Sequence, residues 1–130
     1  MSTRRRQIHH VTLRVADGES ATTFYMAALS ELGMERNIDE HGRTSFGTAD
    51  GHDFGFYSDG ERAYQRAHIA FAATSRTEVD RFHDAALRHG GASLDPPRDR
   101  PEFGGLYSAY LTDPEGNTVE VVYDPSVPRG

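Results

Sequence analysis

Residues 9–34 read HHVTLRVADGESATTFYMAALSELGM, and residues 67–92 read AHIAFAATSRTEVDRFHDAALRHGGA. The two stretches align without a gap at an offset of 58 residues and share six identities within 24 positions. The identical pairs are His10 and His68, Phe24 and Phe82, Ala27 and Ala85, Ala28 and Ala86, Leu29 and Leu87, and Gly33 and Gly91. An internal repeat of this kind indicates that one structural unit is used twice.

Each copy predicts a strand followed by a helix. Apolar residues alternate over residues 11–15 and again over residues 69–71, as on one face of a half-buried strand. In the second copy, residues 75–78 have the spacing of a capping box, which marks the start of a helix. In the first copy, either Asp17 or Ser20 can cap the helix. Turn-rich segments then separate about three short strand candidates in each half.

The chain length and this repeated pattern define the expected architecture. A chain of 130 residues suits one domain with its own core. We therefore expect an α+β fold of two tandem βαβββ modules, covering about residues 7–62 and 63–125 of a single domain that spans residues 1–130.

The composition excludes several classes of function. The chain has no cysteine, so disulfides, thiolate metal sites and a thiol nucleophile are excluded. Acidic residues outnumber basic ones by 20 to 14, which argues against nucleic-acid binding. The one basic run, residues 4–6, is expected to be a solvated tail, and no segment has transmembrane length or the pattern of a targeting signal. We expect a cytoplasmic protein that binds neither nucleic acid nor membrane.

The adjacent histidines His9 and His10 differ in strand phase. Side chains alternate across a strand, so His9 either shares the apolar face with Val11 or lies at the strand's exposed edge, whereas His10 points to the opposite, more polar face. His68, the repeat partner of His10, likewise lies opposite the apolar residues and in phase with the small residue Ala70. The repeat therefore predicts one histidine from each module on a roomy face.

A hairpin predicts the third polar residue. Residues 113–116 read Asp-Pro-Glu-Gly, which is typical of a type I turn in a hairpin. This register places Tyr110 opposite Glu120, with their β-carbons about 5 Å apart on one face. Glu120 lies in an otherwise apolar strand, where burying a carboxylate is costly unless it meets a cation or a metal.

The set of His10, His68 and Glu120 is a candidate metal site. Two imidazoles and one carboxylate suit Fe(II), Mn(II), Zn(II) or a similar ion and leave coordination positions open for substrate. The alternative is that the three are unrelated polar residues, each satisfied by its own surroundings.

In their order and spacing, these segments resemble the vicinal oxygen chelate superfamily, which includes glyoxalase I, extradiol dioxygenases, fosfomycin-modifying enzymes and bleomycin-binding resistance proteins. The resemblance covers almost the whole chain and rests on residues 10–13, Phe24-Tyr25, residues 68–71, and residues 113–117 leading to Glu120. It implies a half-open mixed β-barrel with helices outside. It also implies one divalent metal ion, Fe(II), Mn(II), Zn(II) or Ni(II), at the positions of His10, His68 and Glu120.

The resemblance further implies a small-molecule substrate that chelates the metal through adjacent oxygens. Related proteins are commonly homodimers, and their sites are built either within one chain or from modules of two subunits. On the second arrangement, His10 would meet His68 of a partner.

The branches of the superfamily differ in the residues beside the metal. A glyoxalase I-like site uses a fourth ligand, a glutamate at the end of the first module, and residues 52–57 contain no glutamate. Extradiol dioxygenases use a tyrosine ten residues before the glutamate, which Tyr110 matches, and a histidine upstream of the second ligand, which His52 nearly matches. The resemblance thus gives catalytic roles to Tyr110 and to His52, the latter as acid or base. His52 is equally well an exposed turn residue.

These observations favour a metal-dependent, dioxygenase-like enzyme slightly over a lyase or isomerase as the function of the protein. The alternative from another class is a metal-free protein that sequesters an aromatic or drug-like ligand, as bleomycin-resistance proteins do. Residues 96–105, rich in proline and glycine, are expected to be an exposed loop, either one that closes over the site or a plain surface connection.

Overall fold

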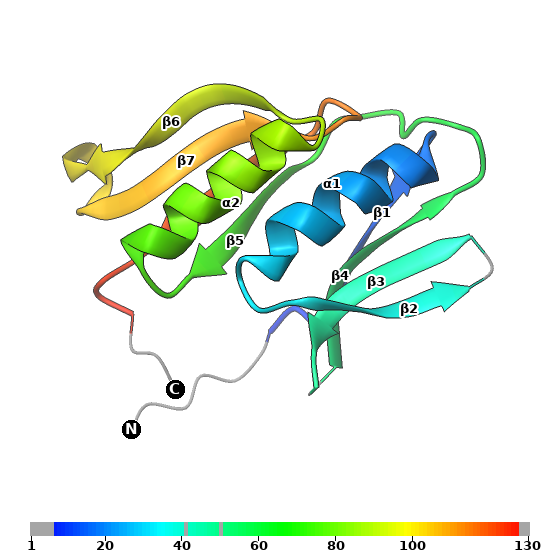
Figure 1. The fold of residues 1–130 in the computed structure, drawn as a ribbon, viewed down its shortest axis with the longest axis horizontal. Helices are drawn as coiled ribbons and strands as arrows, with labels where there is room; N and C mark the ends of the chain where they lie inside the picture. The colour runs from blue at the N-terminus through cyan, green and yellow to red at the C-terminus, as the bar shows by residue number, and fades with distance from the viewer. Residues whose placement is uncertain (1–6, 41, 50, 128–130) are drawn as a thin grey trace.

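The computed structural model describes residues 7–40, 42–49 and 51–127, and in these residues the expected unit occurs twice (Figure 1). Module 1 consists of β1 (Val11–Val15), α1 (Gly18–Ser30), β2 (Glu35–Glu40), β3 (Arg43–Thr48) and β4 (Gly51–Ser58). Module 2 consists of β5 (His68–Ala73), α2 (Arg76–Arg88), β6 (Ala92–Arg100), a short 3₁₀ turn (Pro101–Phe103), β7 (Leu106–Thr112) and β8 (Thr118–Tyr123). The α+β prediction is confirmed, whereas the arginine run at residues 4–6 lies outside the described residues.

Each module forms one mixed four-stranded sheet. The strand orders are β1-β4-β3-β2 and β5-β8-β7-β6. The first strand of each module pairs with the last in parallel, and the other pairings are antiparallel. The two sheets remain separate and are not closed into a barrel, so β1 and β5 each form a sheet edge.

Side-chain caps start both helices where the sequence predicts. The Asp17 side chain accepts a hydrogen bond from the backbone N–H of Ser20, which decides between the two candidate caps of α1. At α2, the Ser75 hydroxyl accepts from the N–H of Glu78, and the Glu78 carboxylate accepts from the N–H of Thr74. Each such cap stabilises a helix by about 1 kcal/mol. Both helices have 13 residues, and neither has the length and apolar run needed to cross a membrane.

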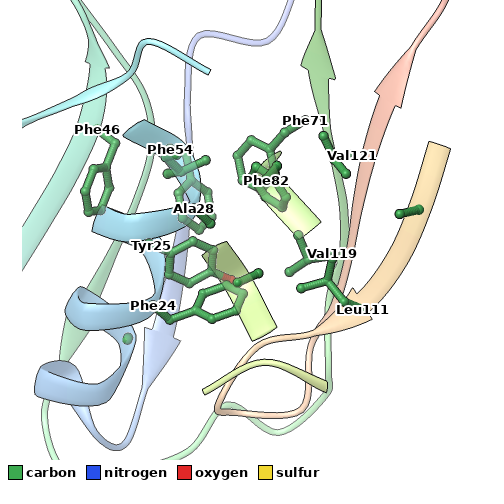
Figure 2. Close-up of a cluster of buried hydrophobic side chains, with 14 of the residues drawn as sticks. Phe24, Tyr25, Ala28, Phe46, Phe54, Phe71, Phe82, Leu111, Val119 and Val121 are labelled. Carbon is green, nitrogen blue, oxygen red and sulfur yellow. The ribbon is translucent and has the colours of Figure 1, made fainter. Parts of the chain in front are cut away.

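The two modules share one hydrophobic core. Helices α1 and α2 pack against each other on the same side of the two sheets (Figure 1). Side chains of α1 lie between aromatic residues of module 1 and apolar residues of module 2. The residues labelled in Figure 2 are Phe24, Tyr25, Ala28, Phe46, Phe54, Phe71, Phe82, Leu111, Val119 and Val121. The helical stripes predicted from the repeat therefore face one another.

The turn between β7 and β8, residues 113–117, binds module 1 through polar contacts; we call it the inter-module turn. The buried carboxylate of Glu115 accepts hydrogen bonds from the backbone N–H groups of Ala16 and Asp17 at the start of α1. The buried carboxylate of Asp113 accepts one from the Tyr25 hydroxyl. A segment that the sequence predicts only as a hairpin turn therefore also fixes one module on the other.

The prediction of an exposed loop over residues 96–105 is wrong for residues 96–100, whereas residues 101–105 form a largely exposed connection between β6 and β7. Strand β6 runs through this segment to Arg100, and the 3₁₀ turn follows. Prolines 96 and 97 are tolerated because β6 is the outer strand of its sheet, where a missing N–H donor breaks no ladder on the open side.

Candidate metal centre

Three of the predicted site residues meet on one face of the module 2 sheet. Tyr110 of β7 pairs directly with Glu120 of β8, as the hairpin register predicts. His68 of β5 lies on the other side of Glu120, and its Nε2 atom is 3.2 Å from Glu120 Oε1. The ring centres of His68 and Tyr110 are 6.1 Å apart, with the rings edge to face. The structure therefore brings together one imidazole, one carboxylate and one phenol.

The spacing of His68 and Glu120 suits a shared metal ion. Two ligand atoms with bonds of about 2.1 Å to one ion lie about 3.0 Å apart at a right angle and about 3.4 Å apart at a tetrahedral angle. The observed 3.2 Å lies between these values. The His68 side chain is 57% exposed and that of Glu120 is 13% exposed, so the pair opens to further ligands on the His68 side. The spacing of these two residues fits a divalent ion, to which they would supply two ligands.

Tyr110 stays a neutral phenol at physiological pH. Burial and then the negative charge of Glu120 raise the pKa of Tyr110 above its ordinary value of 10.0, while the positive charge of Arg100 acts in the opposite direction. The Tyr110 hydroxyl is therefore a hydrogen-bond donor beside the carboxylate.

Arg100 is a residue of this region that sequence reasoning missed. It is 1% exposed, and its guanidinium carbon lies 5.2 Å from the centre of the Tyr110 ring. The guanidinium donates to the hydroxyl and the carbonyl of Ser108, to the Asp95 carboxylate and to the Pro96 carbonyl. Bulges near Asp95 shift the register of β6. The regular alternation of apolar and polar residues is therefore interrupted, and the sequence does not predict that Arg100 is buried. Because its charge is compensated and its geometry fixed, Arg100 can hold the Tyr110 ring in place.

His10, the third predicted ligand, lies in a different cluster. Of the residues that the structure describes, His9, His10 and His52 form the group whose ligand atoms all lie within 4.8 Å of one another. His10 forms no such group with His68 and Glu120 in the described chain. The structure therefore places the predicted triad in two parts, with His10 on module 1 and the pair on module 2.

Strand phase does not bury His9 with the apolar residues, and His9 lies instead at the exposed edge of the strand, the second position that the phase allows. Strand β1 begins at Val11, so both histidines precede it, and both are exposed. Their Nδ1 atoms are 2.8 Å apart, and each ring also contacts the ring of His52. Strand pairing begins only at Val11, so the alternation expected of a paired strand does not position these two side chains.

His52 is a strand residue rather than an exposed turn residue. It is the second residue of β4 and is half-buried. Its partner across the sheet is Gly47, and the register shift beside this pair leaves Asp53 of β4 as the extra residue of a bulge. A side chain at Gly47 would place its Cβ 1.9 Å from the Gly51 carbonyl oxygen, so only glycine allows the close approach of the strands that sets the position of His52.

A cleft of about 610 Å³ lies between the modules, next to both clusters. His9 lines it from module 1 and His68 from module 2. The rings of Phe54 and Phe71 line it as well, and they meet at right angles with centres 5.2 Å apart. Its other apolar lining residues are Ile8, Val11, Leu32, Met34, Ile69, Ala70 and Ala72. A largely apolar cleft with histidines on both sides is the usual form of a small-molecule site.

The family model of the Glyoxalase/Bleomycin resistance protein/Dioxygenase superfamily matches residues 7–121, almost the whole chain. The chain belongs to this superfamily. Membership in the glyoxalase superfamily confirms the resemblance noted from the sequence, and it fixes neither the reaction nor the ligand, because the family contains both enzymes and binding proteins.

Solved structures of other members of the glyoxalase superfamily have the same fold. A glyoxalase/bleomycin resistance protein from Albidiferax ferrireducens is 32% identical, with a TM-score of 0.82 over 92% of this chain and 100% of its own. A glyoxalase-related enzyme from Fulvimarina pelagi is 21% identical, with a TM-score of 0.75 over 97% and 94% of the two chains. Lactoylglutathione lyase from Agrobacterium tumefaciens is also 21% identical, with a TM-score of 0.67 over 93% and 96%. Comparison with curated proteins gives no match.

Proposed function

We propose that the protein is a metal-dependent enzyme that acts on a small substrate with adjacent oxygen atoms, with dioxygenase-like chemistry slightly ahead of lyase or isomerase chemistry. The observation that carries the proposal is the 3.2 Å contact between His68 and Glu120, with Tyr110 paired to Glu120 on the same face. This contact has the spacing of two ligands on one ion and an open side for substrate.

The third ligand in this proposal is His10 of a second copy of the chain. Within one chain His10 belongs to the other cluster, and β1 and β5 are both unpaired sheet edges. An exposed edge offers backbone donors and acceptors to another strand. In a two-fold symmetric homodimer, module 1 of each chain would supply His10 to the pair on module 2 of the other, giving two equivalent sites.

The residues around this site have separable roles. A bound divalent ion would supply Lewis-acid polarisation of the substrate oxygens. Tyr110, held as a neutral phenol, would donate a hydrogen bond or a proton to a substrate oxygen that becomes negative. Phe54 and Phe71 would exclude water and contact the apolar part of the substrate.

Metal content and activity test the proposal. Protein without a polyhistidine tag is purified without chelators, and its metal is measured by elemental analysis before and after reconstitution. The Fe(II) form, prepared without oxygen, is then assayed for oxygen uptake with a panel of catechols. We expect uptake that is lost in His68→Ala and Glu120→Gln and kept in His89→Ala, an exposed histidine at the end of α2.

Two results would count against the enzyme. If no divalent ion binds on reconstitution, the metal-dependent function is rejected. If metal binds to His68 and Glu120 but no catechol drives oxygen uptake, the dioxygenase branch is rejected in favour of oxygen-independent chemistry.

The second candidate is a metal-free binding protein for an aromatic or drug-like ligand. The apolar lining of the cleft, with Phe54 and Phe71, supports it. Calorimetric titration with bleomycin in the presence of a chelator tests this function. Binding that is unchanged in His68→Ala would favour sequestration over catalysis.

A further inference from the structure

We propose that His9, His10 and His52 of one chain form a metal site of their own, for a divalent transition-metal ion that prefers imidazole ligands, such as Zn²⁺ or Cu²⁺. The site belongs to module 1 alone and does not rest on the function proposed above. Both proposed sites use His10, and one His10 side chain can serve only one of them at a time. Substitution of the residues that they do not share, His9 and His52 or His68 and Glu120, therefore distinguishes the two sites.

The three imidazoles already converge. Their ligand nitrogens all lie within 4.8 Å of one another, and the Nδ1 atoms of His9 and His10 are 2.8 Å apart. The ring centres are 5.0 Å apart for His9 and His10, 5.6 Å for His9 and His52, and 4.7 Å for His10 and His52. A hydrogen bond between His9 and His10 would explain only why those two rings lie close together. An ion bound by all three histidines would explain why His52 also lies close to both.

Backbone pairing holds the cluster at one end of the module 1 sheet. Parallel pairing of β1 with β4 sets Val11 beside Phe54. His9 and His10 come just before Val11, and His52 comes just before Phe54, so all three histidines lie at the same end of the sheet. The bulge that requires Gly47 fixes the start of β4 and with it His52. Because Val11 and His52 are themselves paired in the sheet, the backbone beside the cluster is fixed, and we expect small side-chain rotations to close the site.

The geometry fits three-coordinate binding with an open position. Zn²⁺ bonds to imidazole nitrogen are about 2.0–2.1 Å, so two nitrogens on one tetrahedral ion lie about 3.3–3.4 Å apart. The Nδ1 atoms of His9 and His10 are 2.8 Å apart, slightly closer than this value, and no two ligand nitrogens of the cluster are more than 4.8 Å apart. His9 and His10 are exposed, so binding requires little desolvation and leaves room for water or a ligand from the cleft that His9 lines.

The donor set also selects the class of ion. Imidazole suits Zn²⁺, Cu²⁺ and Ni²⁺, whereas Mg²⁺ and Ca²⁺ require oxygen ligands. His68 with Glu120 offers one nitrogen and one carboxylate instead, so the two sites differ in chemistry.

Isothermal titration of the full, tag-free chain with Zn²⁺ alone tests the proposal. We expect His9→Ala and His52→Gln each to weaken binding by at least about tenfold, since even an outer hydrogen-bond partner of a metal ligand is worth about 10–100-fold. The double variant His68→Ala/Glu120→Gln should keep this affinity within about twofold, as should the control His89→Ala, because neither removes a ligand of the cluster. With Cu²⁺ as the probe, electron paramagnetic resonance of the double variant should show coupling to several nitrogens.

The proposal is overturned if His9→Ala and His52→Gln bind Zn²⁺ as the unaltered chain does, or if the double variant loses all binding. His9 is exposed, so its substitution leaves the core intact, and circular dichroism checks that each variant is folded. If the double variant loses oxygen uptake but still binds Zn²⁺, the loss is assigned to the proposed enzyme site, and the histidine cluster is intact.

Discussion

The hydroxyl oxygen of Tyr25 lies 2.5 Å from the carboxylate of Asp113, and this contact joins helix α1 of module 1 to the inter-module turn of module 2. Both residues are almost completely buried. Burial, followed by the charge of Asp113, raises the pKa of Tyr25 well above its ordinary value, so the phenol remains a donor. The same carboxylate accepts hydrogen bonds from the backbone of Glu115 and Asn117 and from the Asn117 side chain.

Replacing Tyr25 with Phe should lower the free energy of unfolding by about 1–3 kcal/mol, because a buried carboxylate loses one of its donors without access to water. Urea unfolding followed by circular dichroism measures the change. Tyr64→Phe is the control, since Tyr64 is 98% exposed. Equal stability of the two variants would contradict a structural role for this hydrogen bond.

Two neighbouring arginines provide a matched test of burial. Arg100 and Arg98 both pair with Asp95, but Arg100 is 1% exposed, whereas the Arg98 side chain is 49% exposed. Arg100→Lys should cost about 1–3 kcal/mol, because an ammonium cannot reach the Ser108 and Pro96 carbonyls and the Asp95 carboxylate together. Arg98→Lys should cost clearly less, as exposed ion pairs contribute little. If the two variants unfold at the same urea concentration, the buried guanidinium network is not stabilising.

Tyr107 should make the fold sensitive to alkali. Its hydroxyl donates to Asp80 over 2.7 Å, and this hydrogen bond, with burial second, raises the pKa of Tyr107 to about 12 from an ordinary value of 10.0. The folded state therefore holds this proton more tightly than the unfolded state. Its contribution to stability is complete below pH 10 and is lost as the pH rises to about 12.

Melting temperatures measured from neutral pH to pH 12 check this expectation. Tyr107→Phe should melt lower at neutral pH and lose less stability than the unaltered protein across the alkaline range. Tyr25 is present in both proteins, so its own titration cancels in the comparison. Parallel curves would show that Tyr107 does not carry the effect.

A shared site in a homodimer predicts complementation between inactive variants. His10→Ala and Glu120→Gln should each abolish the activity found in the substrate panel. After the two are unfolded together and refolded at equal amounts, half of the dimers contain one of each chain, and each of these has one intact site. We expect about one quarter of the unaltered activity. No recovery would indicate that the site lies within one chain.

Local patterns in the sequence predicted most of the fold. The repeat, the capping residues and the stripes of Phe24 and Phe82 depend on neighbours within a few turns, and the structure confirms each of them. The segment from residue 96 to 100 was mispredicted because proline favours loops in general, whereas the open edge of a sheet also accepts it.

The candidate site was predictable only in its module 2 half. The pairing of Tyr110 with Glu120 follows from the turn between them, and His68 follows from the repeat. The contact of His10 with His52 depends on parallel pairing between strands far apart in the sequence, which no short-range pattern encodes.

The parallel pairing of first with last strands also bears on how the chain folds. Val11 pairs with Phe54, and His68 pairs with Thr118, so neither sheet can be completed until the last strand of its module has been synthesised. Closing such long loops is slow compared with forming a helix or a hairpin. During synthesis, β1 and its adjacent histidines therefore leave the ribosome before β4 and stay unpaired until most of module 1 has followed.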